Sequence, residues 1–462
     1  MMRKNPVFLL CVFVFLLRNA AAAADPWVKS IGDGFGDTSN EGVGWIQGFN
    51  GSIYVALDRA SPSTGGAVMY RSADLTNWIK VVGTGTGTIL ADSTTEIIRI
   101  LANGTNGLYF GTHDSASNPA RVYDSTDGTN WTHITTPANG YAPSGNSSIG
   151  GLAVQGTNLF VATVNLNGAQ IWRSRLNGTG FTNVANFANG HNLATGVNTN
   201  INFVSYLYAA TNGTVYASTS HLVDGAPAAP QNGFLYQTSN NGLSWTQNSG
   251  VGNGFGDPNN WHIACMEEFR GCLYASLNNS VAGGQLWCTA NGTNWTQVLT
   301  NGINDARNVE LHHLSVDSGF LWVATLPQPG FFDEVWRSSD GTNFTQSNLP
   351  SFGDPNNCSR FPSVGGLASN ELFGTRNTVT GAQIWRLGPI NTCPSLLAGL
   401  TNSSFLLTWP VMALDFKLES VTNLAPATAW QPCANTPAIS NSQKYVAVPI
   451  VSTSQFYRLR KP

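Results

Sequence analysis

Runs in which apolar and polar residues alternate recur through most of the chain. In residues 44–58 (GWIQGFNGSIYVALD) two such runs flank Asn50-Gly51. An Asn-Gly pair between β-rich runs is a strong hairpin signal, because both residues tolerate a left-handed backbone. A second kind of hairpin occurs in residues 120–135, where ARVYDS leads into Thr-Asp-Gly and TNWTHIT follows. Alternation with a period of two predicts half-buried strands, so we expect groups of four antiparallel strands.

The turn of the second hairpin is repeated along the sequence. Its copies are SADLTNW (72–78), STDGTNW (125–131), SNNGLSW (239–245), TANGTNW (289–295) and SSDGTNF (338–344), with a looser copy at 174–181. Four strands in a repeat of roughly 40–50 residues are typical of a β-propeller blade. One aromatic residue marks the third strand of each repeat: Tyr70, Tyr123, Trp172, Tyr236, Trp287, Trp336 and Trp385. We therefore predict an all-β fold with a seven-bladed β-propeller over residues 25–389.

The last repeat lacks a fourth strand after residues 381–388 (GAQIWRLG). The segment 26–37 (PWVKSIGDGFGD) resembles residues 244–257 (SWTQNSGVGNGFGD), which form a fourth strand and its outgoing loop. We expect the N-terminal strand to complete the last blade, because an open ring would leave two sheet edges unpaired.

From about residue 390 the repeat stops and shorter alternating runs follow. SFLLTWP (404–410), FKLESVTNL (416–424), YVAVPI (445–450) and QFYRLRKP (455–462) are separated by Pro, Asn and Ser turns. This pattern predicts a small β-sandwich over residues 390–462, which resembles fibronectin type III or immunoglobulin-like modules.

The repeated turn resembles the Asp-box of sialidase-like propellers, Ser/Thr-x-Asp-x-Gly-x-Thr-Trp/Phe, which lies between the third and fourth strands. Thr238, Asn240, Gly242 and Trp245 fit its spacing with Asn in place of Asp, and the other copies are one residue shorter. The resemblance implies a structural element on the face away from an active site, so it indicates fold rather than activity.

Composition excludes some classes of protein. Only 10% of the residues are charged, against roughly 25% in average soluble domains, and a net charge of −3 without a basic stripe argues against nucleic-acid binding. Arg3, Lys4, the apolar run 6–17 and the alanines 20–24 have the pattern of a signal peptide (1–24). That run is too short for a membrane span, which needs about 20 residues. We therefore expect a secreted, periplasmic or cell-surface protein that does not span a membrane.

Cysteines in an oxidising compartment are candidates for disulfides. Cys393 and Cys433 lie alone in the C-terminal segment and are expected to pair with each other. Cys272 and Cys288 are predicted on neighbouring strands and form the preferred second pair. Buried free thiols are the alternative for the four cysteines of the repeats: Cys265, Cys272, Cys288 and Cys358.

Propeller ligands usually meet the face that carries the connections between blades, so we searched that face for residues that break the repeat. The candidate ligand-binding residues are Glu41, Arg59, His262, Arg307, Glu310, His312, Arg360 and Arg376. Solvated loop charges are the alternative interpretation. His312-His313 stands where other repeats have Gly150-Gly151, which leaves open a packed core pair or an acid/base or metal role.

The same loops repeat an Asp-x-x-Asn pattern. It places Asp37, Asp257, Asp305 and Asp354 at equivalent positions around the ring. These residues could close Asx-turns, or they could form a ring of carboxylates that coordinates calcium or sugar hydroxyls.

The resemblance to sialidases would imply three arginines around a substrate carboxylate, and Arg307, Arg360 and Arg376 could supply them. The chain lacks an Arg-Ile-Pro-like segment before the first repeat, and its predicted blade count is seven rather than six. No Ser/His/Asp motif, zinc-type spacing, P-loop or dinucleotide fingerprint occurs, so neither a cofactor nor a metal is predicted. We expect a monomeric recognition module for an extracellular glycan or protein. The alternative is a carbohydrate-active enzyme: a glycoside hydrolase, sialidase-like, or a polysaccharide lyase.

Overall fold

The computed structural model describes residues 27–460 with short gaps. The gaps are 32, 60–65, 67, 84–94, 104–106, 115–118, 143–144, 194–200, 224–225, 228–232, 253, 358–362, 368–369, 388–395, 402–403, 411–416, 423–429, 434, 441–442 and 450–454. The predicted signal peptide, Cys358, Arg360, Cys393 and the domain boundary near residue 389 therefore lie outside the described residues.

Most described strands form successive units of four antiparallel strands, as predicted. The first three units are β2 (Asn40–Phe49), β3 (Ser52–Arg59), β4 (Val68–Ser72) and β5 (Ile79–Val82); β6 (Thr95–Asn103), β7 (Gly107–Asp114), β8 (Val122–Ser125) and β9 (Thr132–His133); and β10 (Ser148–Gln155), β11 (Asn158–Val164), β12 (Gln170–Arg175) and β13 (Thr182–Asn186).

The next three units continue the same order. They are β14 (Phe203–Ala209), β15 (Val215–Ser220), β18 (Phe234–Thr238) and β19 (Thr246–Gln247); β20 (Asn260–Phe269), β21 (Cys272–Asn279), β22 (Gln285–Thr289) and β23 (Thr296–Leu299); and β24 (Asn308–Asp317), β25 (Phe320–Pro327), β26 (Val335–Ser338) and β27 (Thr345–Gln346). A two-stranded hairpin, β16 (Leu222–Val223) with β17 (Ala226–Pro227), follows β15 in the fourth unit.

The closing unit combines both ends of the repeat region. It consists of β28 (Ser363–Leu367), β29 (Asn370–Gly374), β30 (Ile384–Leu387) and β1 (Trp27–Lys29). β1 pairs antiparallel with β30, with Trp27 opposite Leu387 and Lys29 opposite Trp385. The expected pairing of the N-terminal strand with the last repeat is thereby confirmed.

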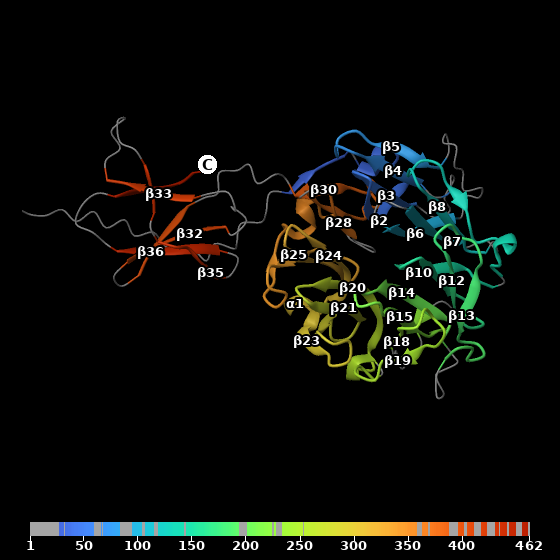
Figure 1. Ribbon diagram of the computed structural model, residues 1–462. Coiled ribbons are helices and arrows are strands. Elements are labelled where there is room, and N and C mark those ends of the chain that lie inside the picture. Colours follow the sequence, from blue (N-terminus) through green and yellow to red (C-terminus); the bar gives the residue numbers. More distant parts are fainter. Residues whose placement is uncertain are drawn as a thin grey trace, which may run out of the picture.

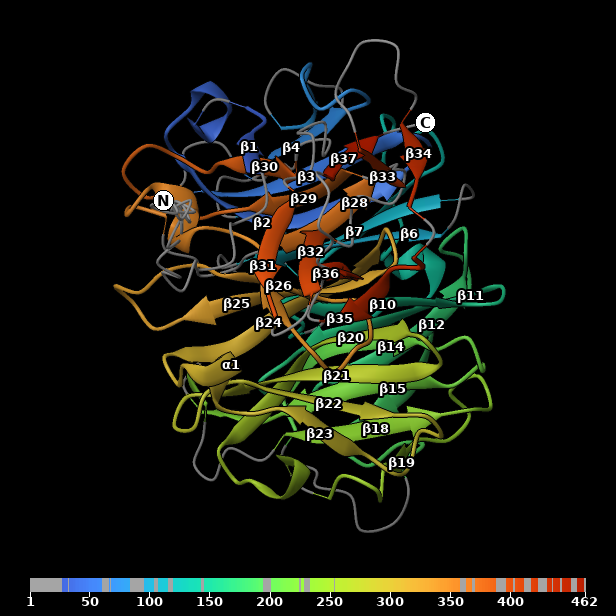
Figure 2. The ribbon, with the colours of Figure 1, turned by 90° about the vertical axis from the view of Figure 1, so that its left-hand side faces the viewer.

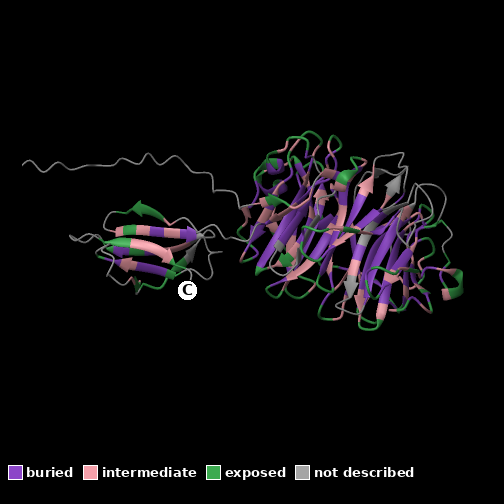
Figure 3. Cartoon of the chain, turned by 90° about the horizontal axis from the view of Figure 1, so that it is seen from above, coloured by how far each residue is buried: buried purple, intermediate pink, exposed green. Residues whose placement is uncertain are grey.

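The units are arranged around a common centre, with the first strand of each unit innermost and the last strand outermost (Figure 1). The first strands β2, β6, β10, β14, β20, β24 and β28 contact one another in sequence, and β28 contacts β2. Some neighbouring units also share a β-bridge, such as Asn278 with Glu310, which joins them into larger sheets. In the views at right angles to Figure 1, each unit is a twisted sheet beside its neighbours, and the strands of these sheets are largely buried (Figures 2 and 3).

The antiparallel order gives the ring two different faces. Each first strand begins, and each second strand ends, at the face that carries the connections between units; we call this the loop-bearing face. The repeated turns lie at the opposite face. Short helical turns lie at several connections: η1 (Asp33–Gly36), η2 (Pro137–Asn139), η3 (Gly254–Gly256), α1 (Asn301–Asn304) and η4 (Pro350–Gly353).

Each of the first six innermost strands carries a β-bulge at the same place. The pairing register shifts directly after Val43, Ile97, Ile149, Val204, Ile263 and Leu311. A bulge re-aims the inserted side chain. In the sixth unit the inserted residue is His312, whereas Gly44 and Gly150 occupy this position in the first and third units.

A buried aromatic side chain from a connecting loop fills the space between neighbouring aromatic residues. Phe255 packs against Trp287 and Trp295, with ring centroids 5.2 and 5.4 Å away. Its φ of 56° is left-handed, which costs roughly 1–2 kcal/mol for a residue with a Cβ. Burial of the ring contributes about 1.5–3 kcal/mol, so packing offsets the strain. Phe35 and Phe352 repeat the arrangement.

The repeated turn has the same internal hydrogen bonds in its shorter copies. In residues 125–131, Gly128 N donates to Ser125 Oγ at 2.8 Å, and Asp127 Oδ1 accepts from the backbone of Thr129 and Asn130. These bonds replace backbone partners that a tight turn cannot supply. The turn is therefore a local structural element, as the sequence indicated.

The C-terminal residues form two further sheets, which Figure 1 shows beside the ring. One contains β31 (Leu397–Leu400), β32 (Ser404–Pro410), β36 (Gln443–Pro449) and β35 (Ala438–Ser440), and the other contains β34 (Gln431–Pro432), β33 (Lys417–Val421) and β37 (Phe456–Arg460). Trp409 and Val446 of the first sheet share a buried cluster with Leu418 of the second. No helix within the described part of the chain is long and apolar enough to cross a membrane.

Candidate functional site

Four side chains meet near the centre of the loop-bearing face, and we call them the axis cluster: His262, Asn278, Glu310 and His312. Glu310 lies near the start of β24 and is 4% exposed. Its carboxylate accepts hydrogen bonds from His312 Nδ1 at 2.6 Å and Asn278 Nδ2 at 2.6 Å. His262 Nε2 lies 3.8 Å from Glu310 Oε1. Three of the predicted candidates therefore come together in one place.

Glu310 is ionised despite its burial. Burial alone would raise the pKa of this carboxyl group, but the positive charges of His312 and His262 and the hydrogen bonds from His312 and Asn278 outweigh it and lower the pKa to about 2. A carboxylate that accepts from Nδ1 fixes the tautomer of the imidazole. In a neutral His312, Nε2 is therefore the unprotonated ring nitrogen.

Two aromatic rings border the axis cluster. Phe203, at the start of β14, lies nearly parallel to Trp261 of β20, with ring centroids 6.0 Å apart and an interplanar angle of 15°. Both rings also contact His262 edge-on. Both side chains are half-buried. The centre of this face thus combines aromatic surface with hydrogen-bonding groups.

The predicted arginines at the rim are held by carboxylates of their own or neighbouring loops. Arg59 Nη2 lies 2.9 Å from Asp37 Oδ2, and Arg376 Nη2 lies 3.0 Å from Glu41 Oε2. Arg307 forms a fork with Asp305, with Nε donating to Oδ1 at 2.7 Å. The guanidinium group of Arg307 also stacks over Phe331, 4.4 Å from the ring centroid. Arg307 and Arg376 are thus each paired with a different carboxylate, Asp305 and Glu41.

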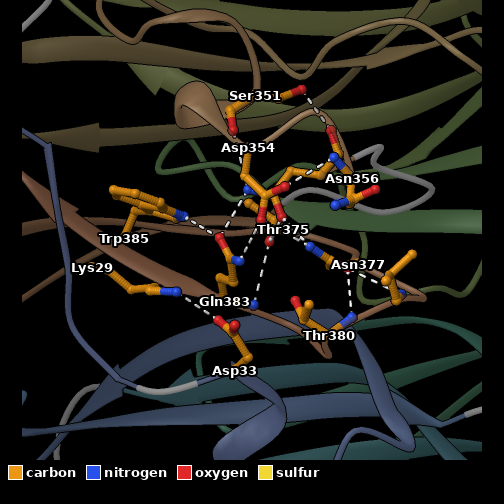
Figure 4. A network of polar contacts seen from close by, with 12 residues as sticks. Lys29, Asp33, Ser351, Asp354, Asn356, Thr375, Asn377, Thr380, Gln383 and Trp385 are labelled. Atoms are coloured by element: carbon orange, nitrogen blue, oxygen red, sulfur yellow. Dashed lines mark hydrogen bonds and ion pairs between the residues drawn. The ribbon is translucent and has the colours of Figure 1, made fainter.

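The Asp-x-x-Asn loops form closed hydrogen-bond networks, which Figure 4 shows in the closing unit. Asp354 Oδ1 accepts from Asn356 N, and Asp354 Oδ2 accepts from Gln383 Nε2 at 2.9 Å and Asn377 Nδ2 at 3.2 Å. Gln383 Oε1 in turn accepts from Trp385 Nε1 at 3.0 Å. The repeated aspartates at 37, 257 and 305 likewise accept from the backbone two residues on. The Asx-turn interpretation is confirmed for these loops.

The structure offers little for a metal ion in the parts that it describes. Among those residues, no group of three or more His, Cys, Asp or Glu side chains is placed to hold one. Within the described loops, therefore, the repeated aspartates do not form a group of carboxylates that could hold calcium.

The cysteines of the fifth unit are free thiols in the structure. Cys288 lies opposite Tyr274 in the pairing of β21 with β22, so Cys272 is its diagonal neighbour. Burial, followed by the charge of Cys272, raises the pKa of the Cys288 thiol. Diagonal neighbours are roughly 7–8 Å apart at Cα, at the limit for an unstrained disulfide. The Cys272–Cys288 disulfide is not formed here and stays a prediction, as does Cys393–Cys433, of which Cys433 is described as a free thiol.

Asn278, Phe203 and Trp261 were not among the predicted residues, because none of them places a charge where the repeat has none. One signal could have found the aromatic pair. When the innermost strands are aligned on their bulges, Phe203 takes the place of Glu310, and Trp261 stands directly before the predicted His262. Asn278 could be recognised as a site residue only from the pairing of β21 with β24, and this pairing depends on how neighbouring units pack.

Comparisons with known proteins give only distant likenesses. No family model matches the chain, and no curated protein matches it. The sialidase of Trypanosoma rangeli, solved with sialic acid, is 10% identical with a TM-score of 0.41, over 91% of this chain and 90% of that one. Prolyl oligopeptidase B from Galerina marginata is 9% identical with a TM-score of 0.46, over 81% of this chain and 56% of that one.

A nidogen/laminin complex is similar over 61% of this chain and 89% of that one, at 11% identity and a TM-score of 0.38. The chain spans about half the length of the prolyl peptidase chains that it matches. At TM-scores below 0.5, these likenesses carry no argument about the activity of this protein.

Proposed function

We propose that this protein is a secreted recognition module that binds an extracellular glycan or protein on the loop-bearing face, centred on the axis cluster. The observation that carries the proposal is the arrangement of Glu310 between His262 and His312 beside the rings of Phe203 and Trp261. Binding sites combine apolar surface with a few fixed polar groups. Aromatic rings suit the flat faces of sugars, and fixed donors and acceptors suit their hydroxyl groups.

The rim of the same face supports recognition rather than electrostatic capture. Its arginines are neutralised by neighbouring carboxylates. In the last three units, the loop between the second and third strands exposes one large apolar residue: Val281, Phe332 and Val379 are 68%, 47% and 65% exposed. Interface cores are depleted in charge, so a rim of this kind fits a neutral partner.

The proposal includes the finer architecture that the sequence suggests. The six successive units and the closing unit would be seven blades of one propeller, whose repeated turns are Asp-box turns. Residues 390–462 would form a fibronectin III-like sandwich, and residues 1–24 would be a signal peptide. Limited proteolysis with mass spectrometry of the secreted protein locates the boundaries near residues 24 and 389.

A glycan array with the mature protein, residues 25–462, tests the proposal. Any glycan that binds should bind at least tenfold more weakly to Trp261→Ala and to His312→Ala. His133→Gln is the matched control, because it changes a histidine on the outermost strand β9. A glycan that binds all three variants like the wild type would contradict the proposed site, and an array without binding would contradict the glycan ligand.

Catalysis on carbohydrate is a second candidate function, and the 2.6 Å bond between His312 Nδ1 and Glu310 favours it. Such a bond leaves Nε2 to act as a general base, while Glu310, whose pKa is about 2, would only position the ring. Hydrolase and lyase assays on each bound glycan decide the question. A catalytic His312 predicts a loss of roughly 10²–10⁴-fold in rate for His312→Ala; absence of turnover by the wild type would contradict catalysis.

A further inference from the structure

Glu371 occupies a position that is aliphatic in every other unit of the ring. It lies in β29, two residues before Phe373, which pairs with the aromatic marker Trp385. The residues at the equivalent place in the first to sixth units are Ile53, Leu108, Leu159, Val215, Leu273 and Leu321, and all six are buried. An acid at this place departs from the repeat inside a strand rather than in a loop.

The carboxyl group of Glu371 lies in the joint between the sixth unit and the closing unit. Its side chain is 1% exposed. Oε1 accepts from Ser315 Oγ of β24 at 3.1 Å, whereas Oε2 is buried and has no hydrogen-bond partner among the described residues. An ionised carboxylate in this setting would lack a compensating donor, and burial of such a charge is strongly unfavourable.

The charges around Glu371 do not compensate it. Of the neighbouring elements, β24 contributes Glu310, His312, His313 and Asp317, β2 contributes Glu41, and β30 contributes Arg386, whereas β28 and β25 contribute no titratable side chain. In β26, the guanidinium group of the buried Arg337 lies over the rings of Phe320 and Trp322, which belong to the same joint. The charge that acts on Glu371 is that of Asp317, which is negative and adds to the effect of burial in raising the pKa of Glu371 well above its usual value.

We infer that Glu371 is held as a neutral carboxylic acid and that the joint between the sixth unit and the closing unit is a proton-dependent latch. A protonated carboxyl group has an O–H to donate and carries no charge to bury. Loss of the proton places a negative charge beside Asp317, inside the joint. The ring then loosens at the unit that also contains β1, the strand on which closure depends.

The direction of the pH dependence follows from the raised pKa. The folded-state pKa of Glu371 lies above its unfolded value, so its contribution to stability is fully present below the unfolded pKa and is lost as pH rises through the folded pKa. The latch is therefore closed at mildly acidic pH and weakened in alkaline solution.

Thermal unfolding from about pH 5 to about pH 9, bracketing the usual range of carboxyl and histidine titration, tests the latch. We expect the melting temperature of the wild type to fall across this range. Glu371→Leu, which restores the residue type of the other units, and Glu371→Gln, which keeps the shape, should both show a smaller fall. Glu267→Gln is the comparison from a different joint. It should also reduce the fall, because the pKa of Glu267 is raised to about 7, but it should leave the behaviour of β1, β29 and β30 in hydrogen exchange unchanged.

Hydrogen exchange locates the effect. In the wild type, peptides from β1, β29 and β30 should lose protection at alkaline pH before peptides from β10 and β11 do, and Glu371→Leu should abolish this difference. Equal pH profiles for wild type, Glu371→Leu and Glu371→Gln would overturn the latch. Restoration of wild-type stability at alkaline pH by calcium chloride, but not in Glu371→Gln, would overturn it in favour of a cation site.

Discussion

Trp27 packs edge-on against Phe352 with ring centroids 5.4 Å apart, and Trp295 packs against Phe255 at the same separation. Trp295 belongs to a copy of the repeated turn, whereas Trp27 lies more than three hundred residues from its partner in the sequence. The N-terminal strand therefore supplies the closing unit with the aromatic residue that the other units obtain from their own hairpin. Its indole N–H also donates to Ser347 Oγ at 3.0 Å.

Truncation of Trp27 should open the ring. We expect Trp27→Ala to lower the free energy of unfolding by about 3–5 kcal/mol, measured by denaturant titration. Val28→Ala changes the adjacent residue, which is 46% exposed, and should cost no more than about 0.5 kcal/mol. Equal costs for the two variants would contradict the importance of β1 for closure.

Glycine in the repeated turns is required for space as well as for its backbone conformation. Gly128 has a φ of 72°, and a Cβ there would overlap the hydroxyl group of Tyr54 in the neighbouring unit. Gly51 has a similar φ of 68°, with open space around it. Gly51→Ala should cost roughly 1–2 kcal/mol for the strained backbone.

Gly128→Ala should lower the free energy of unfolding by about 1–3 kcal/mol more than Gly51→Ala does, because it also overpacks the contact with Tyr54. Tyr54→Phe in the Gly128→Ala background should recover part of that difference, because it removes the overlapping hydroxyl group. Denaturant titration of the wild type and the three variants measures this, and equal stabilities of Gly128→Ala and Gly51→Ala would contradict the steric explanation.

The axis cluster should make stability sensitive to acid. The folded-state pKa of Glu310 is lowered to about 2, so its contribution is present above the unfolded pKa and is lost as pH falls through the folded pKa. We expect the wild type to lose stability between about pH 5 and about pH 2, and Glu310→Gln to show a shallower loss. Urea titration at several pH values measures both; parallel curves would show that Glu310 is not stabilised as a carboxylate.

Glu267 should act in the opposite direction. Burial is the main reason that its pKa is raised to about 7, so its contribution to stability is lost as pH rises through neutrality. Glu267→Gln should therefore lose less stability than the wild type between about pH 5 and about pH 8, measured by urea titration, because the wild type loses stability as pH rises from the unfolded-state pKa to the folded-state pKa of Glu267 and the variant does not. A variant that is destabilised equally at pH 5 and pH 8 would indicate a structural role for the carboxylate instead.

Much of the fold could be predicted because short stretches of sequence determine the strands and turns within each unit. Strand alternation, the Asn50-Gly51 turn and the repeated hairpin phrase all specify contacts within one unit, and the structure has strands and turns at those places. The pairing of Trp27 with Leu387 was predictable because the segment around Trp27 copies another fourth strand.

The candidate site was predictable only in part. Glu310 and His312 were found because they interrupt the repeat, but Asn278 and Phe203 reach the site through the way neighbouring units pack. The arginines illustrate the opposite difficulty. Arg307 was a candidate ligand-binding residue, yet Asp305, two residues earlier, holds its guanidinium group.

Glu371 shows a different reason for failure. Its position looks unremarkable in sequence, because a glutamate next to Asn370 suggests a hairpin end. Only the register against β30 reveals that the side chain takes the place of an aliphatic residue in a joint. Registers between strands of a unit must therefore be known before such a substitution can be recognised.

The pairing of β1 with β30 also has a consequence for biosynthesis. The first strand emerges from the ribosome early, but its partner follows only after the remaining repeats have been made. Contacts of such long sequence separation are slow to form, and domains made vectorially must tolerate unpaired edges until they close. During translation, the nascent chain would hold an incomplete ring with an exposed edge, and this interval is when it would most need protection from aggregation.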